Sequence, residues 1–169
     1  DWVLLRDAAL TLVQAIVLIR EQGLRHRIRP PEELLREMNK LCIEMTHTRK
    51  KKDAKKMRKT ILRRMKKLMK TIEGHARNYR ALLITHYRQI GWSRRKAWSV
   101  LKRIKGILRQ LPAAITQAHE RIIGERRIDN AEKILSLYEP DVHVIVRGKA
   151  GAEVEFGNGL YLAEQADGL

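Results

Sequence analysis

The sequence predicts a mainly α-helical protein, built as a long-helix bundle or a helical hairpin and followed by a short antiparallel β segment. Two patterns support this prediction. Apolar residues recur at three- and four-residue steps through most of residues 2–127, which is the spacing of one helix face. Beyond Asp129 the apolar period changes to two, which is typical of a strand with one buried face. With 169 residues, the chain has the length of one domain.

The first predicted helix covers residues 2–22, and Gly23 marks its end. Its most apolar run, residues 8–19, includes Thr11 and Gln14 and is shorter than the roughly 20 residues that a membrane span needs. The run also lacks the basic leader and the small-residue cleavage site of a signal peptide. We therefore expect no membrane partner.

The second predicted helix begins at Pro30-Pro31, with two glutamates in its first turn, where acids suit the helix dipole. The apolar step is lost at residues 46–48, so the helix either bends there or continues to Ile72. A continuous helix over residues 30–72 would be about 65 Å long at about 1.5 Å per residue. Such an arm exceeds the diameter of a domain of this size, so it would project or fold back as a hairpin.

The stretch from Arg49 to Lys70 carries the strongest signal in the chain. Thirteen of its 22 residues are Lys or Arg and one, Asp53, is acidic, so it supplies +12 of the net charge of +17. An apolar stripe without Gly or Pro runs through this basic block, which predicts an amphipathic helix and not a disordered tail. Because like charges four residues apart repel, packing on the stripe or a polyanion on the other face must offset the repulsion.

Three shorter helices are expected after the basic block. Glu73-Gly74 is predicted to break or soften the run, so the third helix covers residues 76–89. The fourth covers residues 94–110 behind a serine N-cap. Leu111-Pro112 then separates it from a fifth helix over residues 113–127.

Two strand-like runs follow, at residues 143–146 and 153–164. One parity of the second run is apolar and is expected to face a core, whereas Glu153 and Glu155 point away. The residues of this apolar parity are Val154, Phe156, Leu160 and Leu162.

We divide the chain into a helical region with the long basic helix, residues 1–130, and a β-hairpin segment, residues 131–169. The strands are too few to close a core alone. The chain also begins at Asp1 without Met and stops within a strand-like pattern. We therefore expect a fragment of a longer protein.

No residue set in the sequence has the pattern of a catalytic or metal site. The six histidines show no three- or four-residue spacing and accompany no cluster of Cys or carboxylates. The one cysteine, Cys42, excludes an internal disulfide and is interpreted as a core residue. The glycine-rich loop at residues 147–151 lacks both phosphate-binding motifs. Residues 90–95 are similar to a helix-turn-helix turn, but Tyr87 stands where that motif needs a small residue, so an ordinary helix corner is favoured.

Four strings in the C-terminal third resemble the middle region of bacterial insertion-sequence transposases with a DDE catalytic triad, in particular the ISNCY group. These strings are Glu132–Asp141, Val144–Gly151 (VIVRGKAG), Val154–Gly157 (VEFG) and Leu160–Glu164. The segment Asp1–Ala8 also resembles the one that follows the first catalytic strand of that group. The helical middle of the chain, including Thr46–Lys50, fits the insertion that those proteins carry between their first two strands. The resemblance implies that the β segment is part of an RNase H-like fold.

The resemblance further implies two-metal phosphoryl transfer on DNA, with Mg²⁺ held by three carboxylates of the full-length parent. It implies a bacterial, cytoplasmic location and allows a homodimer in the full protein. The catalytic carboxylates would lie before Asp1 and after Leu169. We therefore assign no catalytic residue, no metal ligand and no cofactor to this chain, and predict that it is inactive alone.

DNA contact is the part of this chemistry that the chain itself is expected to supply. A ratio of thirteen bases to one acid is too lopsided for an ordinary solvated helix face. Lysine is a point charge suited to phosphate, and the basic block has no aromatic residue for stacking on unpaired bases. Duplex DNA, bound through its backbone, is the expected partner. The predicted DNA-binding residues are Lys50, Lys51, Lys52, Lys55, Lys56, Arg58, Lys59, Arg63, Arg64, Lys66, Lys67 and Lys70 of the basic block, and Arg147 and Lys149 of the hairpin.

Two alternatives stay open at the level of sequence. The chain could be a non-enzymatic basic helical protein that binds DNA or RNA. The long helix could also form a dimeric coiled coil, although its irregular, Met-rich stripe argues against a strict zipper.

Overall fold

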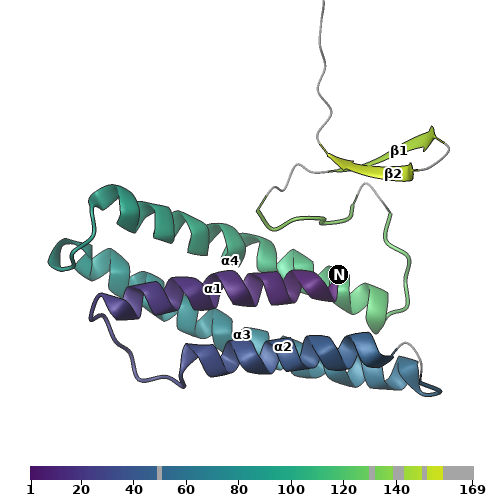
Figure 1. The fold of residues 1–169 in the computed structure, drawn as a ribbon, viewed down its shortest axis with the longest axis horizontal. Helices are drawn as coiled ribbons and strands as arrows, with labels where there is room; N and C mark the ends of the chain where they lie inside the picture. The colour runs from purple at the N-terminus through teal and green to yellow at the C-terminus, as the bar shows by residue number, and fades with distance from the viewer. Residues whose placement is uncertain (49–50, 130–131, 139–142, 150–151, 158–169) are drawn as a thin grey trace, which may run out of the picture.

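The computed structural model describes residues 1–48, 51–129, 132–138, 143–149 and 152–157, the last two ranges by their backbone only. Within the described residues, four α-helices form the body of the protein (Figure 1): α1 (Trp2–Glu21), α2 (Pro31–His47), α3 (Ala54–His86) and α4 (Arg94–Ile122). A short 3-10 helix, η2 (Tyr87–Gln89), precedes α4. Two strands follow, β1 (His143–Lys149) and β2 (Ala152–Gly157).

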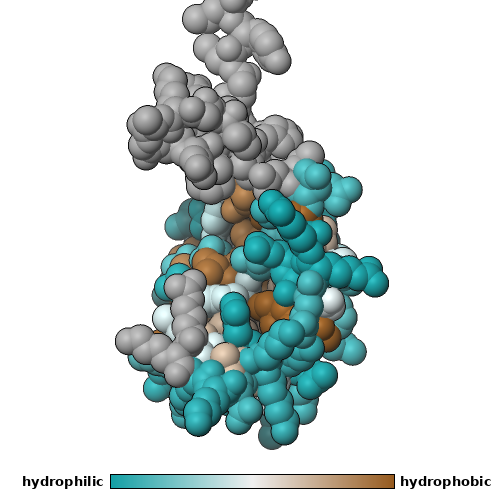
Figure 2. All heavy atoms as spheres, turned by 90° about the vertical axis from the view of Figure 1, so that its right-hand side faces the viewer, coloured by the Kyte–Doolittle hydropathy of each residue, from teal (hydrophilic) through white to brown (hydrophobic). Residues whose placement is uncertain are grey.

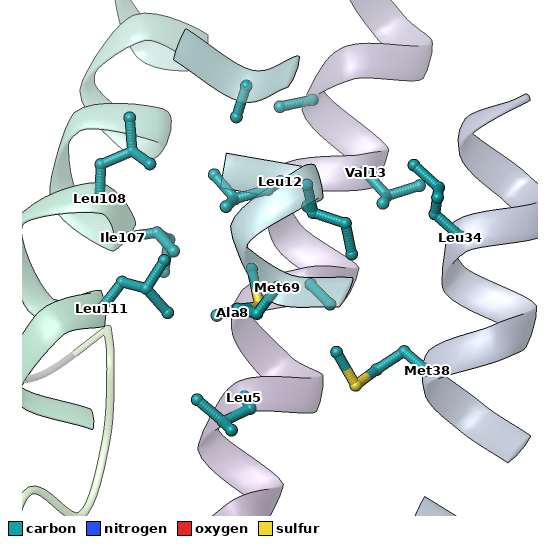
Figure 3. Packing of buried hydrophobic residues seen from close by; sticks show 14 of the residues in the cluster. Leu5, Ala8, Leu12, Val13, Leu34, Met38, Met69, Ile107, Leu108 and Leu111 are labelled. Carbon is teal, nitrogen blue, oxygen red and sulfur yellow. The ribbon is translucent and has the colours of Figure 1, made fainter. Parts of the chain in front are cut away.

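The four helices form a bundle in which α1 and α3 contact each other and run in the same direction. α2 and α4 each contact both of these helices and lie on opposite sides of the pair (Figure 3). Because α1 packs against three other helices, it is apolar around most of its circumference. Ten of its 20 residues are buried.

The core is mostly aliphatic. Leu5 and Leu12 of α1 belong to one buried cluster with Met38 of α2, Met69 of α3 and Leu111 of α4 (Figure 3). Burial of each such side chain contributes about 1.5–3 kcal/mol. These contacts supply the packing that offsets charge repulsion along the basic helix.

α2 and the basic helix do not form one continuous arm. α2 ends at His47, and the chain folds back through a turn before α3 begins at Ala54. The hydroxyl of buried Thr48 donates to the carbonyl of Met45 at 2.7 Å, which satisfies one free carbonyl at the helix end. The break thus lies where the sequence loses its apolar step, and the two helices form a hairpin.

The predicted helix end at Glu73-Gly74 is wrong, because α3 runs unbroken from Ala54 to His86. A glycine inside a helix costs only about 0.5–1 kcal/mol relative to alanine. The neighbouring side chains Ile72 and Ala76 are fully buried and offset that cost. The third predicted helix is therefore the second half of α3.

The predicted separation at Leu111-Pro112 is also wrong, since α4 continues from Arg94 to Ile122 with Pro112 inside it. Pro112 is exposed, whereas Leu111 and Ala114 on either side are fully buried. Packing of this face against the bundle outweighs the local preference of proline for a helix end, which is about 3 kcal/mol. The fourth and fifth predicted helices are one helix.

The predicted fold class needs a larger correction, because an antiparallel β segment belonging to an RNase H-like fold is not found. Helices supply nearly all of the core, Leu137 of the segment 132–138 adds to it, and no described strand contributes. β1 and β2 pair with each other in antiparallel register, with Val144 opposite Phe156, and among the described residues they contact no helix. An isolated two-stranded hairpin is marginally stable at best and cannot be the central sheet of such a fold.

The predicted orientation of the second strand concerns side chains outside the described part of the chain. This holds for Val154 and Phe156, of which only the backbone is described, and for Leu160 and Leu162. The segment at residues 132–138 is described with side chains and packs on the bundle. Its Leu137 is buried, and the side-chain amide of Gln117 donates to the carbonyl of Ile134 at 3.0 Å.

α1 is longer than the apolar run at residues 8–19, because the helix extends that run on both sides to 20 residues. By length and composition alone it could cross a membrane, although 56% of its most apolar window is buried inside the bundle. Core helices of soluble proteins share both properties. The argument from a run too short to span a bilayer is therefore wrong.

Candidate nucleic-acid interface

The outward face of α3 carries a row of cations. Lys56, Arg63, Lys67 and Lys70 are exposed and follow one another at steps of seven, four and three residues, so they share one side of the helix. The buried residues of α3 lie on the opposite side and pack into the bundle. From Lys56 to Lys70 this row extends about 21 Å at about 1.5 Å per residue. A duplex of that length carries about 12 phosphate charges.

Two further exposed cations, Lys51 and Lys52, lie in the turn immediately before α3. They continue the row at the end of the bundle where α2 turns into α3. Hydrophilic side chains cover most of the described surface at this end (Figure 2). We call the whole set the outer strip. It consists of Lys51, Lys52, Lys56, Arg63, Lys67 and Lys70, none of which forms an ion pair with a described residue.

The bases on the flanks of α3 have partners inside the protein. Lys55 and Lys59 both form ion pairs with Glu125, which follows α4, and the Lys59 contact is 2.6 Å. Arg64 binds Glu44 of α2 at 2.8 Å. Lys66 donates to the Nδ1 atom of His119 on α4 at 3.2 Å. We call these four residues the flank bases: carboxylates partly neutralise Lys55, Lys59 and Arg64, and all four tie α3 to its neighbours.

Glu125 is placed for this contact by the end of α4. It has φ of 58°, a left-handed conformation that is uncommon for residues other than glycine. The next residue, Arg126, donates its backbone N–H to the carbonyl of Glu120 at 3.0 Å, which closes the turn. Hydrogen bonds from Lys55 and Lys59 lower the pKa of the Glu125 carboxyl, so it stays ionised at neutral pH.

The remaining predicted DNA-binding residues are not brought together with the outer strip. Arg58 is half-buried, and its Nε atom has no hydrogen-bond partner among the described residues. Lys50 lies outside the described residues. Arg147 and Lys149 belong to β1, which is described by its backbone and contacts none of the helices. The structure therefore groups six of the predicted residues on one accessible surface.

A groove beside the outer strip extends the basic surface onto α2. It has a volume of about 900 Å³, and Ile43 and Met57 contribute to its apolar floor. Arg36 and Lys40 of α2 lie on one rim, and Lys56 of the outer strip lies on the other. The sequence prediction missed the two α2 cations because glutamates surround them along the chain.

A second basic surface lies on α4 and was also missed at the level of sequence. Between Ile90 and His119 the chain has no acid, a signal that a count of acids along the chain would have found. The cations of this stretch are all exposed. They are Arg94, Arg95, Lys96, Lys102, Arg103, Lys105 and Arg109.

The corner between α3 and α4 is an ordinary helix connection and not a helix-turn-helix. The hydroxyl of Ser93 accepts from the backbone N–H of Lys96 at 3.2 Å, so Ser93 is the predicted N-cap of α4. α4 then runs back along α3, as the contact between Lys66 and His119 near the far end shows. The two helices of a helix-turn-helix cross at about 90–120° instead.

Potential metal ligands and the single cysteine were the remaining candidates for chemistry. The described residues contain no group of three or more His, Cys, Asp or Glu side chains that could hold a metal ion. Cys42 is buried in the core, as predicted, and burial raises the pKa of its thiol, which makes it a poor nucleophile at neutral pH.

Comparison with known proteins gives no relative: no protein-family model matches the chain, and neither a curated protein nor a solved structure shows significant similarity to it.

Proposed function

We propose that this protein binds the phosphate backbone of duplex DNA through the outer strip, without reading base sequence. The observation that supports the proposal is the separation of charges around α3. Its flank bases are paired with Glu44, Glu125 and His119, while the six cations of the outer strip have no ion-pair partner among the described residues. Unpaired cations in a row are the electrostatic footprint that a polyanion requires.

The fold also lowers the cost of binding. The buried side of α3 contains nine residues that pack in the core, so the helix is formed before any ligand arrives. A preformed helix loses little conformational entropy on binding. The intramolecular packing of this stripe also leaves it unavailable for a coiled coil with a second chain, which argues against the zipper alternative.

Backbone contact is favoured over base readout by the residue types. Five of the six cations of the outer strip are lysines, and lysine binds phosphate as a point charge. Arginine forks and amide side chains, which read guanine and adenine edges, are the usual means of sequence recognition. Among the strip residues, Arg63 is the one guanidinium.

The proposal is tested by removing four charges from the strip and, in a matched control, four from the flanks. The strip variant replaces Lys56, Arg63, Lys67 and Lys70 by Gln. Each phosphate contact contributes somewhat under about tenfold at 0.1 M salt, so four lost contacts should weaken duplex binding by about 10³–10⁴-fold. The log–log salt slope of the unchanged protein, near about −5 for six contacts, should flatten to about −2.

The control variant replaces Lys55, Lys59, Arg64 and Lys66 by Gln. It removes the same formal charge, but these side chains are already paired, so the expected loss of affinity is tenfold or less. The affinity of both variants is measured for a duplex of one defined sequence and for a duplex of random sequence and equal length. Equal losses in the two variants, or a loss on one sequence alone, would contradict backbone binding by the outer strip.

Descent from an insertion-sequence transposase is a separate proposal that rests on the C-terminal strings, and Mg²⁺-dependent phosphoryl transfer would belong to its full-length form. We expect the present chain to neither nick nor join DNA in Mg²⁺ or Mn²⁺. Metal-dependent cleavage that disappears on changing Glu155 or Asp167 to the amide would overturn that expectation. If the chain binds duplex DNA and is not part of a larger enzyme, it is instead the non-enzymatic binding protein.

A further inference from the structure

An exposed tryptophan stands out on α4. The side chain of Trp98 is 54% exposed, whereas Trp2 and Trp92 are partly buried against the core. Trp92 is additionally covered by the ammonium group of Lys96, which lies 5.1 Å from its ring centroid. A large apolar ring of this exposure is costly to leave in water, and Trp98 does not belong to the buried core cluster.

The surroundings of Trp98 are cationic. Arg94 and Lys102 are four residues before and after it, Arg95 is three before and Lys105 is seven after, so all four lie on the same side of α4. Each of these cations is exposed, and none forms an ion pair with a described residue. We call Trp98 with these four cations the Trp98 patch.

We propose that the Trp98 patch binds single-stranded nucleic acid. The indole of Trp98 stacks on one unpaired base, and the surrounding cations contact the phosphates on either side of that base. A ring platform flanked by cations is the combination that single strands require, and stacking tolerates any base because every base has a π-face. The bases of a duplex are already stacked on one another, so a duplex cannot use the ring.

The same arrangement argues against Trp98 as a contact between two copies of the protein. A self-complementary interface centred on Trp98 would bring two sets of four cations together without an acid between Ile90 and His119 to compensate them. Like-charge juxtaposition of this kind costs several kcal/mol. A polyanion with exposed rings can pair its phosphates with the four cations and stack a ring on the apolar surface of Trp98.

This inference goes beyond the duplex proposal and does not depend on it, because it concerns a different helix and a different ligand. The experiment measures fluorescence anisotropy with labelled oligo(dT) and oligo(U) of 12 nucleotides and with a hairpin duplex. The variants are Trp98→Ala, Trp98→Phe, which keeps a ring, and Val3→Ala, which truncates an exposed apolar side chain on α1, outside both proposed binding surfaces.

Trp98→Ala should weaken binding of the single strands by at least about fivefold, the loss expected from one stacked base. Trp98→Phe should retain most of the affinity, and Val3→Ala should bind like the unchanged protein. Duplex binding should be the same in all four proteins. Four phosphate contacts should give single-strand binding a salt slope near about −3.

Single-strand affinity that Trp98→Ala leaves unchanged would overturn the inference. So would sedimentation showing a dimer that this substitution dissociates, because Trp98 would then be an interface between copies. Preference for oligo(U) over oligo(dT), or the reverse, identifies whether RNA or DNA is the source of the single strand. Loss of duplex binding in the strip variant with intact single-strand binding keeps the two proposals separate.

Discussion

α3 and α4 are neighbouring antiparallel helices of the same bundle, and both are strongly basic. α3 has eleven Lys or Arg and a single acid, Glu73, while α4 has eight and a single acid, Glu120. They differ in what accompanies the charge. The outward face of α3 has no aromatic residue and its flank cations are paired within the protein, whereas α4 carries exposed Trp98 among unpaired cations. Charge alone attracts any polyanion, and the aromatic ring decides which kind can bind more tightly.

The largest expected effect comes from removing the same number of charges from each helix. Replacing Arg94, Arg95, Lys102 and Lys105 of the Trp98 patch by Gln should weaken single-strand binding by about 10²–10³-fold at 0.1 M salt. The same variant should weaken duplex binding by tenfold or less. The strip variant should show the opposite preference, with a large loss for the duplex and a small one for the single strand. Anisotropy titrations of both variants against both ligands check this. Two variants with the same ligand profile would mean that the helices form one undivided basic surface.

The next effect concerns Pro112, which lies inside α4 although the sequence predicted a helix end there. Pro112→Ala should stabilise α4 by about 2 kcal/mol. The alanine restores a helical hydrogen bond and removes the clash of the proline ring, which together stabilise the helix by about 3 kcal/mol. It also raises the conformational entropy of the unfolded chain, which offsets about 1 kcal/mol of that gain. Urea unfolding followed by circular dichroism measures the change. A destabilised variant would show that the proline ring itself is part of the packing.

Glu125→Gln tests whether ion pairing with Glu125 prevents the flank lysines of α3 from contacting DNA. The substitution frees Lys55 and Lys59, so duplex affinity should rise by up to about tenfold if one of them gains a phosphate contact. Glu120→Gln, which breaks a pair on the same turn with Arg126 instead, serves as the control. An unchanged duplex affinity in Glu125→Gln would mean that these two lysines do not face the DNA.

The same substitution has a pH signature. Lys55 and Lys59 hold the pKa of Glu125 below its ordinary value of 4.5, so the ion pairs stabilise the fold above that pH. The stabilisation is lost as the pH falls through the lowered pKa, where the carboxyl takes up a proton. Glu125→Gln should therefore be slightly less stable than the unchanged protein at pH 7, and this difference in stability should shrink as the pH falls below 4.5, in thermal unfolding at a series of pH values. The reverse order would contradict the lowered pKa.

The smallest expected effect is that of Gly74→Ala in α3. A methyl group at this position meets no atom within 4 Å, and the residue lies inside the helix. The substitution should raise the free energy of unfolding by about 0.5–1 kcal/mol, or the melting temperature by about 1–4 °C. Differential scanning calorimetry is sensitive enough to detect this. Duplex binding should not change, because the alanine adds no charge to the face that carries the outer strip.

The sequence by itself determined that the protein is mainly helical, that Ser93 begins a helix, that Cys42 is buried and that the basic stretch forms an amphipathic helix. These features depend on spacing and on local capping, which act within a few residues of the chain. The helix ends predicted at Gly74 and Pro112 depended on local propensity as well, but there the buried neighbours on both sides outweigh the local cost.

Only the tertiary structure decided which cations are free. Every cation of the basic block looks alike along the chain, yet Glu44 of α2 and Glu125 beyond α4 neutralise one part of them and leave the outer strip unpaired. The fold class was also decided at this level, because α1, packed against three helices, closes the core without a sheet. Pairing between residues 20 to 70 positions apart depends on how helices pack, and a local pattern carries no information about it.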